Sequence, residues 1–429
     1  MTSSRLLRAF DILWRLSIVL LPWQTRWFLD ASIHGVTWEQ GRISMYVSWF
    51  ALLATVVVGF LLPSKEPQKE KRSRLVWVFS AILFSVTIIA TRLDRQALTA
   101  VLQWWAQVML LGACVVSVKR QQVPWKTLAT WFMISLIPFT ILGFVQYATQ
   151  EVWGSKWLGI AAQLSQNSGV SVVEHGAYRI LRIYGGFSHP NIFGGWLAIG
   201  VLTSFLLSLK VESKRDAIFC ALTASSFSVA LLLTYARSAW LAMVIAGTIL
   251  LVHVFRTRRA SQFFWLALVA SFLSVAIVGF SQRDHILARG DTSSRLESLS
   301  VNTRIASLQD GVDTLLMHPL IGTGPNAELY VTWVAEQPFD MLNPSPVPFE
   351  SPHNVFLLAV ENFGFIGMAI IIALLFLVVR TPTRRLGVIA FFAPLLIIGL
   401  FDHYFWSYWS GQSLVALAIL LSNTQDPRA

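Results

Sequence analysis

The hydrophobic residues of this chain fall into long runs separated by short polar segments. About twelve of these runs are close to 20 residues long, the length that a helix needs to cross a bilayer. They cover residues 9–29, 43–62, 74–91, 97–117, 127–148, 190–209, 216–234, 237–255, 262–280, 353–379, 386–401 and 405–421. The pattern predicts an all-α, polytopic membrane protein with about twelve transmembrane helices, in which residues 1–429 form a single integral membrane domain.

The polar segments between the runs differ in length and in charge. Short segments rich in lysine and arginine alternate with less basic ones, and cytoplasmic loops carry such a positive bias. The bias predicts that the N- and C-termini are both cytoplasmic. The outer side then receives the two longest loops, about 150–190 and 281–352, the second of them between helices 9 and 10. Because loops on a rigid scaffold often carry function, we expect the active face there.

Composition agrees with a membrane protein. The chain is 55% hydrophobic and 13% charged, whereas a soluble domain has about 25% charged residues. The net charge of +11 would by itself suggest a nucleic-acid partner. The basic residues that orient the helices account for that charge, so we predict no nucleic-acid partner. Cys114 and Cys220 both lie inside apolar runs, which argues against a disulfide framework or a zinc site.

An amphipathic helix is predicted within the loop 281–352. Its apolar positions have helical spacing, with Asn302 or Thr303 as the expected cap and Pro319 as the expected end. These positions are Ile305, Leu308, Val312, Leu315 and Leu316. We expect this helix to lie flat on the outer interface or over the mouth of the bundle, and to carry part of the active site.

Arg237 lies in the short turn between the seventh and eighth runs. An arginine there can snorkel towards water. It can also face a cavity and bind an anion, as ionisable residues near membrane depth usually do. An arginine on the outer side opposes the positive-inside trend, and we therefore favour an anion-binding role.

Arg179 and Arg182 precede a helix that is predicted to begin at Pro190 and Asn191. The free N–H groups of a helix start could help to bind phosphate, although an ordinary capped start explains the same residues. We interpret His189 as a capping or packing residue.

Arg304 and His353 lie near the two ends of the same loop. A lone arginine in a polar loop is usually solvated, and a histidine at a helix start is often a cap. An imidazole is nevertheless the natural general base for a hydroxyl near neutral pH. Asp402 and His403 form another outer polar group, which either supports the site or belongs to an interfacial belt.

The chain lacks a Walker-type phosphate loop, a His-Glu-x-x-His motif, a Gly-x-Ser-x-Gly motif and an Asp-x-Asp pair. Several arginines, one histidine and no evident metal cage suggest a substrate that brings its own phosphates. We therefore expect no metal and no cofactor.

Four groups of motifs lie in order between Arg182 and Gly364. They are Arg182 with Gly186-Phe-Ser-His-Pro-Asn191, Thr234-Tyr-Ala-Arg-Ser-Ala-Trp240, Arg304 with His318-Pro-Leu-Ile-Gly-Thr-Gly324, and Pro352-His-Asn354 with Glu361-Asn-Phe-Gly364. In this order and spacing they resemble the O-antigen ligase superfamily. That superfamily also contains O-antigen and exopolysaccharide polymerases and protein O-oligosaccharyltransferases.

The resemblance implies a GT-C-like glycosyltransferase of the bacterial inner membrane that takes its glycan from an undecaprenyl-diphosphate carrier on the periplasmic face. The outer loop 281–352 is then a large periplasmic loop. By resemblance, Arg237 and Arg304 grip the diphosphate, Arg182 is a less certain basic position, and His353 is the essential histidine. Expected supporting residues are Asn354, Asn191, His403 and Arg179. The reaction implied is inverting and metal-independent: an acceptor hydroxyl attacks the anomeric carbon, and the lipid diphosphate leaves.

The motifs leave the acceptor open. A ligase would use a sugar of lipid A–core, and a polymerase would use another carrier-linked repeat; we place the ligase first. A transporter or flippase for the same lipid carriers is the alternative of another class. It predicts charged residues at mid-membrane depth in several helices, whereas here they concentrate at the outer edge.

Overall fold

The computed structural model describes residues 3–33, 36–65, 70–175, 178–258, 260–290, 295–332, 350–379 and 385–422. Each predicted run overlaps a helix in these ranges. The helices are α1 (Ser3–Leu20), α2 (Val47–Leu61), α3 (Glu70–Ala90), α4 (Arg95–Arg120), α5 (Trp125–Thr149), α6 (Pro190–Ser208), α7 (Lys214–Leu233), α8 (Arg237–Thr257), α9 (Gln262–Ser281), α13 (Val355–Val379), α14 (Arg385–Gly399) and α16 (Trp409–Ser422). The shorter helices are α10 (Arg283–Ala288), α11 (Arg295–Met317), α12 (Glu328–Tyr330) and α15 (Tyr404–Ser407).

Seven helices in the described ranges are long and apolar enough to cross a membrane: α4 to α9 and the 355–374 part of α13. Shorter apolar stretches occur in α2, α3, α14 and α16. The chain is therefore a mostly helical membrane protein, while about twelve crossings stay a prediction. The first predicted run, 9–29, is wrong at its C-terminal end, because α1 stops at Leu20. Pro22 follows shortly after, where a helix cannot easily continue.

Four small two-stranded sheets depart from the predicted all-α fold. All are antiparallel. They pair β1 (Arg26–Leu29) with β4 (Ile43–Tyr46), β2 (Ser32–Ile33) with β3 (Val36–Thr37), β5 (Glu151–Val152) with β6 (Gln163–Leu164), and β7 (Val172–His175) with β8 (Tyr178–Leu181). Strands this short give no long alternating pattern, which is why the sequence reading missed them.

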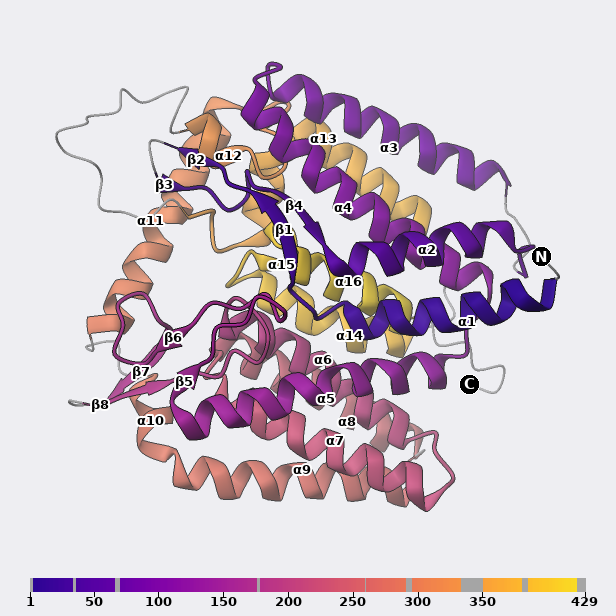
Figure 1. The fold of residues 1–429 in the computed structure, drawn as a ribbon, viewed down its shortest axis with the longest axis vertical. Coiled ribbons are helices and arrows are strands. Elements are labelled where there is room, and N and C mark those ends of the chain that lie inside the picture. The colour runs from indigo at the N-terminus through magenta and orange to yellow at the C-terminus, as the bar shows by residue number, and fades with distance from the viewer. Residues whose placement is uncertain are drawn as a thin grey trace.

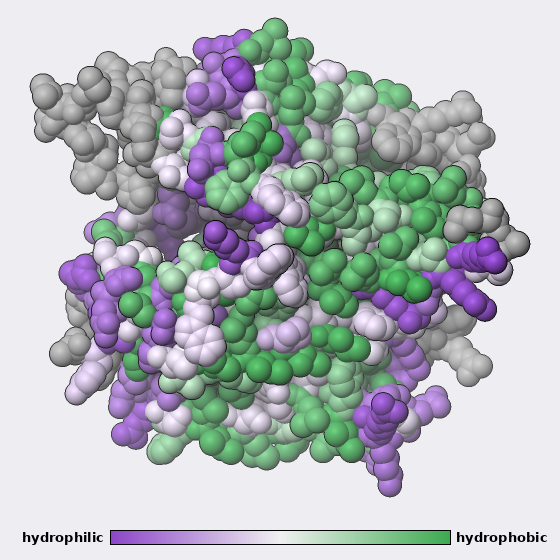
Figure 2. Space-filling model, in the orientation of Figure 1, coloured by the Kyte–Doolittle hydropathy of each residue, from purple (hydrophilic) through white to green (hydrophobic). Residues whose placement is uncertain are grey.

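The strands and α10 to α12 gather towards one side of the molecule, and the long helices extend away from them (Figure 1). We call this side the loop end. Hydrophilic side chains collect at the loop end around a hollow, whereas apolar side chains cover the helices beside it (Figure 2). On this face, apolar helices thus adjoin a polar loop end, as expected for a protein in a bilayer.

Helix α6 is the central helix of the bundle. Nearly every one of its residues is buried, and it packs against α5, α7, α8 and α14. Pro190 occupies its first turn and the His189 side chain accepts a hydrogen bond from the Asn191 backbone N–H, as predicted for a capped helix start. A rigid central helix therefore begins at the loop end.

Helix α13 is interrupted at Gly364, whose φ of +59° is open to glycine alone without strain. The 318–324 segment fills the gap. Thr323 and Gly324 donate backbone hydrogen bonds to the carbonyls of Glu361 and Asn362, at 3.1 and 2.9 Å. The Phe365 N–H returns a bond to the carbonyl of Pro319 at 2.8 Å. The motifs 318–324 and 361–364 thus pack together through backbone hydrogen bonds, which hold the N-terminal part of α13 in place.

Helix α11 corrects the predicted amphipathic helix. It begins at Arg295, so Asn302 lies inside the helix and caps nothing. Its predicted apolar stripe is largely exposed, with Ile305, Val312 and Leu316 all on the surface. The helix packs against α13 through a buried face that includes Ser307 and Gly311. Its placement on the outer interface or over the mouth of the bundle stays a prediction.

Candidate functional site

A cavity of about 640 Å³ opens at the loop end. Its walls come from the start of α6, α11, the segment 350–353, the segment 402–408 and the β1–β4 hairpin, which is the segment 26–46. The charged and histidine side chains that line it are Arg26, Glu39, Arg182, His189, Arg289, Arg304, Glu350, His353, Asp402 and His403. The predicted residues Arg182, Arg304, His353 and His403 thus meet at one cavity, together with Asn191.

Helix α11 contributes one continuous face to the cavity. Its lining residues are Leu296, Leu299, Ser300, Thr303 and Arg304. They recur at intervals of three and four residues, and such positions share one side of a helix. The whole face lies upstream of the apolar stripe that the sequence analysis used.

Arg304 is the cation of this face. Its Nε is buried without a hydrogen-bond partner, and its guanidinium makes no ion pair with any described residue. It also lines a second cavity of about 270 Å³, which contains Arg237 and shares Arg289 and Asn191 with the first. Arg304 therefore connects the two cavities and has donors free for an anion.

Arg237 is held by a buried carboxylate. Its guanidinium lies 2.9 Å from Glu297, which is itself 5% exposed, and donates to the carbonyl of Arg289 at 2.9 Å. The Arg289 guanidinium pairs with the other oxygen of Glu297. Burial is the main cause of the lowered pKa of Arg289, and the positive charges of Arg182, Arg237 and Arg304 lower it further. One carboxylate thus balances two arginines in a group that contains four.

Arg182 is buried beside the start of α6. It donates to the carbonyl of Thr234 at 2.7 Å and to the side-chain oxygen of Asn191 at 2.5 Å. Asn191 in turn donates to Asp402 at 2.8 Å. Burial lowers the pKa of Arg182 to about 10, so it remains a cation at neutral pH. Asn191 therefore links the arginine group to the segment that carries His403.

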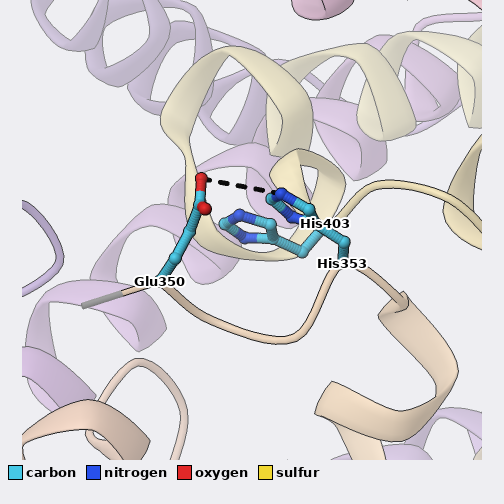
Figure 3. A group of neighbouring side chains, drawn as sticks. All are labelled: Glu350, His353 and His403. Carbon is cyan, nitrogen blue, oxygen red and sulfur yellow. Dashed lines mark ion pairs between the residues drawn. The ribbon is translucent and has the colours of Figure 1, made fainter. Parts of the chain in front are cut away.

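His353 and His403 stack with their ring centroids 5.2 Å apart and their planes 17° from parallel. Figure 3 shows the two rings side by side with Glu350 next to them. The Nε2 of His353 lies 3.6 Å from Glu350, while its buried Nδ1 has no hydrogen-bond partner among the described residues. His353 thus lines the cavity with Glu350 beside its ring.

His403 and His189 are held neutral. Burial lowers the pKa of His403 to about 4, helped by His353, and lowers that of His189 to about 3, helped by Arg182. Burial would raise the pKa of Asp402, but His353, His403 and His189, with the bond from Asn191, bring it below its ordinary value. Asp402 is therefore a carboxylate between neutral imidazoles, and His189 is the capping residue that we predicted.

Glu350, His353 and His403 have the donor types of a metal site. Their ligand atoms lie within 4.8 Å of one another. Neighbouring ligands of a tetrahedral zinc ion lie about 3.4 Å apart, given bonds of about 2.1 Å. The side chains would have to move closer to hold such an ion, so the predicted absence of a metal stays a prediction.

Two expected supporting residues have structural roles. Asn354 caps α13, because its side-chain oxygen accepts from the N–H groups of Phe356 and Leu357 at 2.9 and 3.0 Å. Arg179 pairs with Glu174 at 3.3 Å on the β7–β8 hairpin and does not line the described cavities. The placement of Arg179 thus weakens its predicted role at the site.

Sequence reasoning missed Arg289 and Glu297, and also Arg26 and Glu39. The helical spacing of Leu296, Leu299 and Arg304 was a usable signal for an earlier start of α11. Arg26 fell inside a predicted membrane run, and nothing local marked it as part of a hairpin. These four residues were found only because distant segments meet at one cavity.

Residues 221–372 match a family model described as O-antigen ligase. The resemblance to the O-antigen ligase superfamily is thereby confirmed. The matched stretch carries Arg237, Arg289, Arg304 and His353, whereas Arg182, Asn191, His403 and the β1–β4 hairpin lie outside it. No curated protein matches the chain. The family match supports a glycosyl-transfer activity of the O-antigen ligase or polymerase type.

Proposed function

We propose that this protein transfers a glycan from an undecaprenyl-diphosphate carrier to an acceptor hydroxyl, at the periplasmic face of a bacterial inner membrane. The observation that carries the proposal is the meeting of Arg182, Arg289, Arg304 and His353 at one cavity. The leading acceptor is lipid A–core, which makes the protein an O-antigen ligase.

The arginine group suits a diphosphate. Arginines bind phosphate oxygens through two donors and remain charged at physiological pH. Arg304 has free donors, and Arg237 and Arg289 share only one carboxylate between them. These cations stabilise the negative charge that grows on the leaving diphosphate. Glu297 then competes with the substrate, because its ion pairs with Arg237 and Arg289 must weaken when the phosphate binds.

His353 accepts the proton of the attacking hydroxyl. The oxygen of that hydroxyl forms a bond to the anomeric carbon, and the bond from this carbon to the diphosphate breaks with inversion. The proton moves to the imidazole, whose positive charge the neighbouring Glu350 stabilises. Stacking on the neutral His403 holds the ring beside the cavity.

The charge pattern supports the proposed orientation. The basic turns lie away from the loop end. Within them, the Lys65 N–H donates to the carbonyl of Arg120 and the Lys126 ammonium donates to the carbonyl of Lys210. A cytoplasmic position for these turns agrees with the positive-inside rule. It leaves the cavity on the periplasmic side.

A polymerase is the second candidate. Its donor is the same, and only the acceptor differs. Asp402 and His403 line the cavity, and the family match supports ligase and polymerase activity alike. Both activities therefore need to be tested with both acceptors.

The test supplies purified protein with carrier-linked glycan and either lipid A–core or a second carrier-linked glycan. We expect free undecaprenyl diphosphate and one glycosylated acceptor, and we expect His353→Ala to abolish both. His253→Ala in α8 is the matched control, because it lies sixteen residues from Arg237, about 24 Å along the helix. Full release by His353→Ala, or none by the wild type, would contradict the proposal. A ladder of growing carrier-linked chains would identify the polymerase.

A further inference from the structure

The β1–β4 hairpin forms the wall of the cavity at the histidine side. Arg26 and Glu39 of this hairpin line the cavity, as do Tyr408 and His403. Neither Arg26 nor Glu39 belongs to the stretch that matches the O-antigen ligase family. The cavity thus has a second polar surface, which the proposed diphosphate chemistry does not use.

The hairpin is firmly anchored. Trp38 near its tip stacks on Tyr330 with centroids 5.4 Å apart, and Tyr46 at its base stacks on Trp409 at the same distance. Gln103 of α4 donates to the carbonyl of Ser44 at 2.6 Å. Anchors at the tip, middle and base hold the hairpin side chains in fixed positions beside the cavity, as a preorganised binding surface requires.

Arg26 and Glu39 form a balanced pair. Their charged groups lie 2.5 Å apart, and Arg26 also donates to Ser44 and Tyr46 at 3.2 and 3.3 Å. Arg42 also contacts Glu39 from outside the cavity, and its charge is balanced by Asp30 at 2.9 Å. Because the pair carries little net charge, it attracts a second anion far less than the arginine group around Arg304 does.

Tyr408 lies between the hairpin and the histidines. Its ring centroid is 5.8 Å from that of His403. Burial raises the pKa of its phenol, and the nearby carboxylates of Glu39 and Glu350 raise it further. The side chain is therefore a neutral phenol, with one O–H donor and an aromatic face next to the site of proton transfer.

We propose that Arg26, Glu39 and Tyr408 form the acceptor subsite and bind a neutral, hydroxyl-rich sugar ring whose reacting hydroxyl reaches His353. The inference rests on the proposed function and deepens it. The carboxylate accepts hydrogen bonds from sugar hydroxyls, while the guanidinium and the phenol donate to sugar oxygens. The arginine group holds the donor diphosphate at the other side, so the two substrates approach His353 from opposite walls.

The test separates the two substrates kinetically. The double variant Arg26→Gln and Glu39→Gln removes both charges together and leaves no unpaired ion between them. We expect the acceptor KM to rise at least about tenfold, as the loss of a hydrogen bond to a charged group predicts. The donor KM and kcat should stay within about twofold. The two KM values and kcat are measured with undecaprenyl-diphosphate glycan as donor and with the acceptor that the wild type uses.

The matched control is the double variant Arg179→Gln and Glu174→Gln. This is likewise an arginine–glutamate ion pair on a small antiparallel hairpin at the loop end, but neither residue lines the cavity. We expect its acceptor KM to equal that of the wild type. If the hairpin variant does not fold, Tyr408→Phe gives a second reading, with an expected acceptor KM about three to ten times higher.

The outcomes distinguish this inference from the proposed function. An active wild type whose acceptor KM is unchanged in both the hairpin variant and Tyr408→Phe overturns the subsite alone. A raised donor KM with an unchanged acceptor KM also overturns it, because the hairpin would then bind the donor. A wild type that releases no carrier diphosphate overturns the proposed function, and the subsite with it.

Discussion

The arginine side and the histidine side of the cavity differ in how their charges are balanced. At the arginine side, Arg304 has no ion-pair partner among the residues that the structure describes, and one glutamate serves both Arg237 and Arg289. At the histidine side, Arg26 is paired with Glu39, and the imidazole of His403 is neutral. The first arrangement leaves room for an anion and the second for neutral hydroxyls. Under the proposed function, this difference separates an anionic donor from a neutral acceptor within one cavity.

The largest expected effect breaks the arginine side. Arg304→Ala should lower kcat/KM about 10²- to 10³-fold, as the loss of a donor to developing charge does. Arg237→Ala should cost less, because Glu297 already engages Arg237 in the free protein. Release of carrier diphosphate is the measurement, and the acceptor KM is the control. Equal losses in the two variants would show that the unpaired state of Arg304 has no bearing on donor binding.

The next effect moves the histidine itself. A Cβ at residue 311 would lie 2.5 Å from Cγ of Pro352, directly before His353. Gly311→Ala should therefore push His353 away from the reacting hydroxyl and reduce kcat about tenfold, at a cost of about 1–3 kcal/mol in stability. Steady-state kinetics and thermal unfolding measure the two. Gly112→Ala is the control, because no atom lies within 4 Å of a Cβ at that site. An unchanged kcat would refute the steric argument.

A smaller effect concerns pH. The folded-state pKa of His403 is about 4 and that of His189 about 3, both below the roughly 6.5 of an unfolded histidine. Between these values the unfolded chain binds more protons, so stability falls as the pH drops from about 6.5 towards 4 and changes little above 6.5. The thermal unfolding midpoint of the detergent-solubilised protein should be lower at pH 5 than at pH 7. In His403→Gln the difference between the midpoints at pH 7 and pH 5 should be smaller. An equal difference in the variant would argue against a contribution from His403.

The smallest expected effect concerns a metal at the histidine side. Glu350, His353 and His403 have suitable donors, but their ligand atoms spread over up to 4.8 Å. Because the proposed mechanism assigns stabilisation of the leaving diphosphate to arginines, we expect a chelator to leave the rate within about twofold. The rate is measured before and after dialysis against EDTA, followed by addition of zinc. A loss on dialysis that zinc restores would assign catalysis to a metal held there.

The sequence located the apolar helices because each is a local pattern. Arg237, Arg304 and His353 were recognised by their positions next to such patterns and by resemblance. The start of α11 was misplaced because its first turns present a mixed face to the cavity, with Ser300 and Arg304 beside Leu296 and Leu299, and such a face is a weak amphipathic signal. The β1–β4 hairpin was missed because its strands are short and partly overlap an apolar run.

What the sequence alone determined is therefore the membrane character, the positions of most helices and the type of chemistry at a few loop residues. Only the tertiary structure decided which charges meet. Asn191 bonds to Asp402, 211 residues away in the chain, and Arg26 faces the same cavity as His353. Helical periodicity arises from neighbours three or four residues apart, so it is written in the sequence. Contacts across the cavity arise from the packing of separate helices, and no local pattern records them.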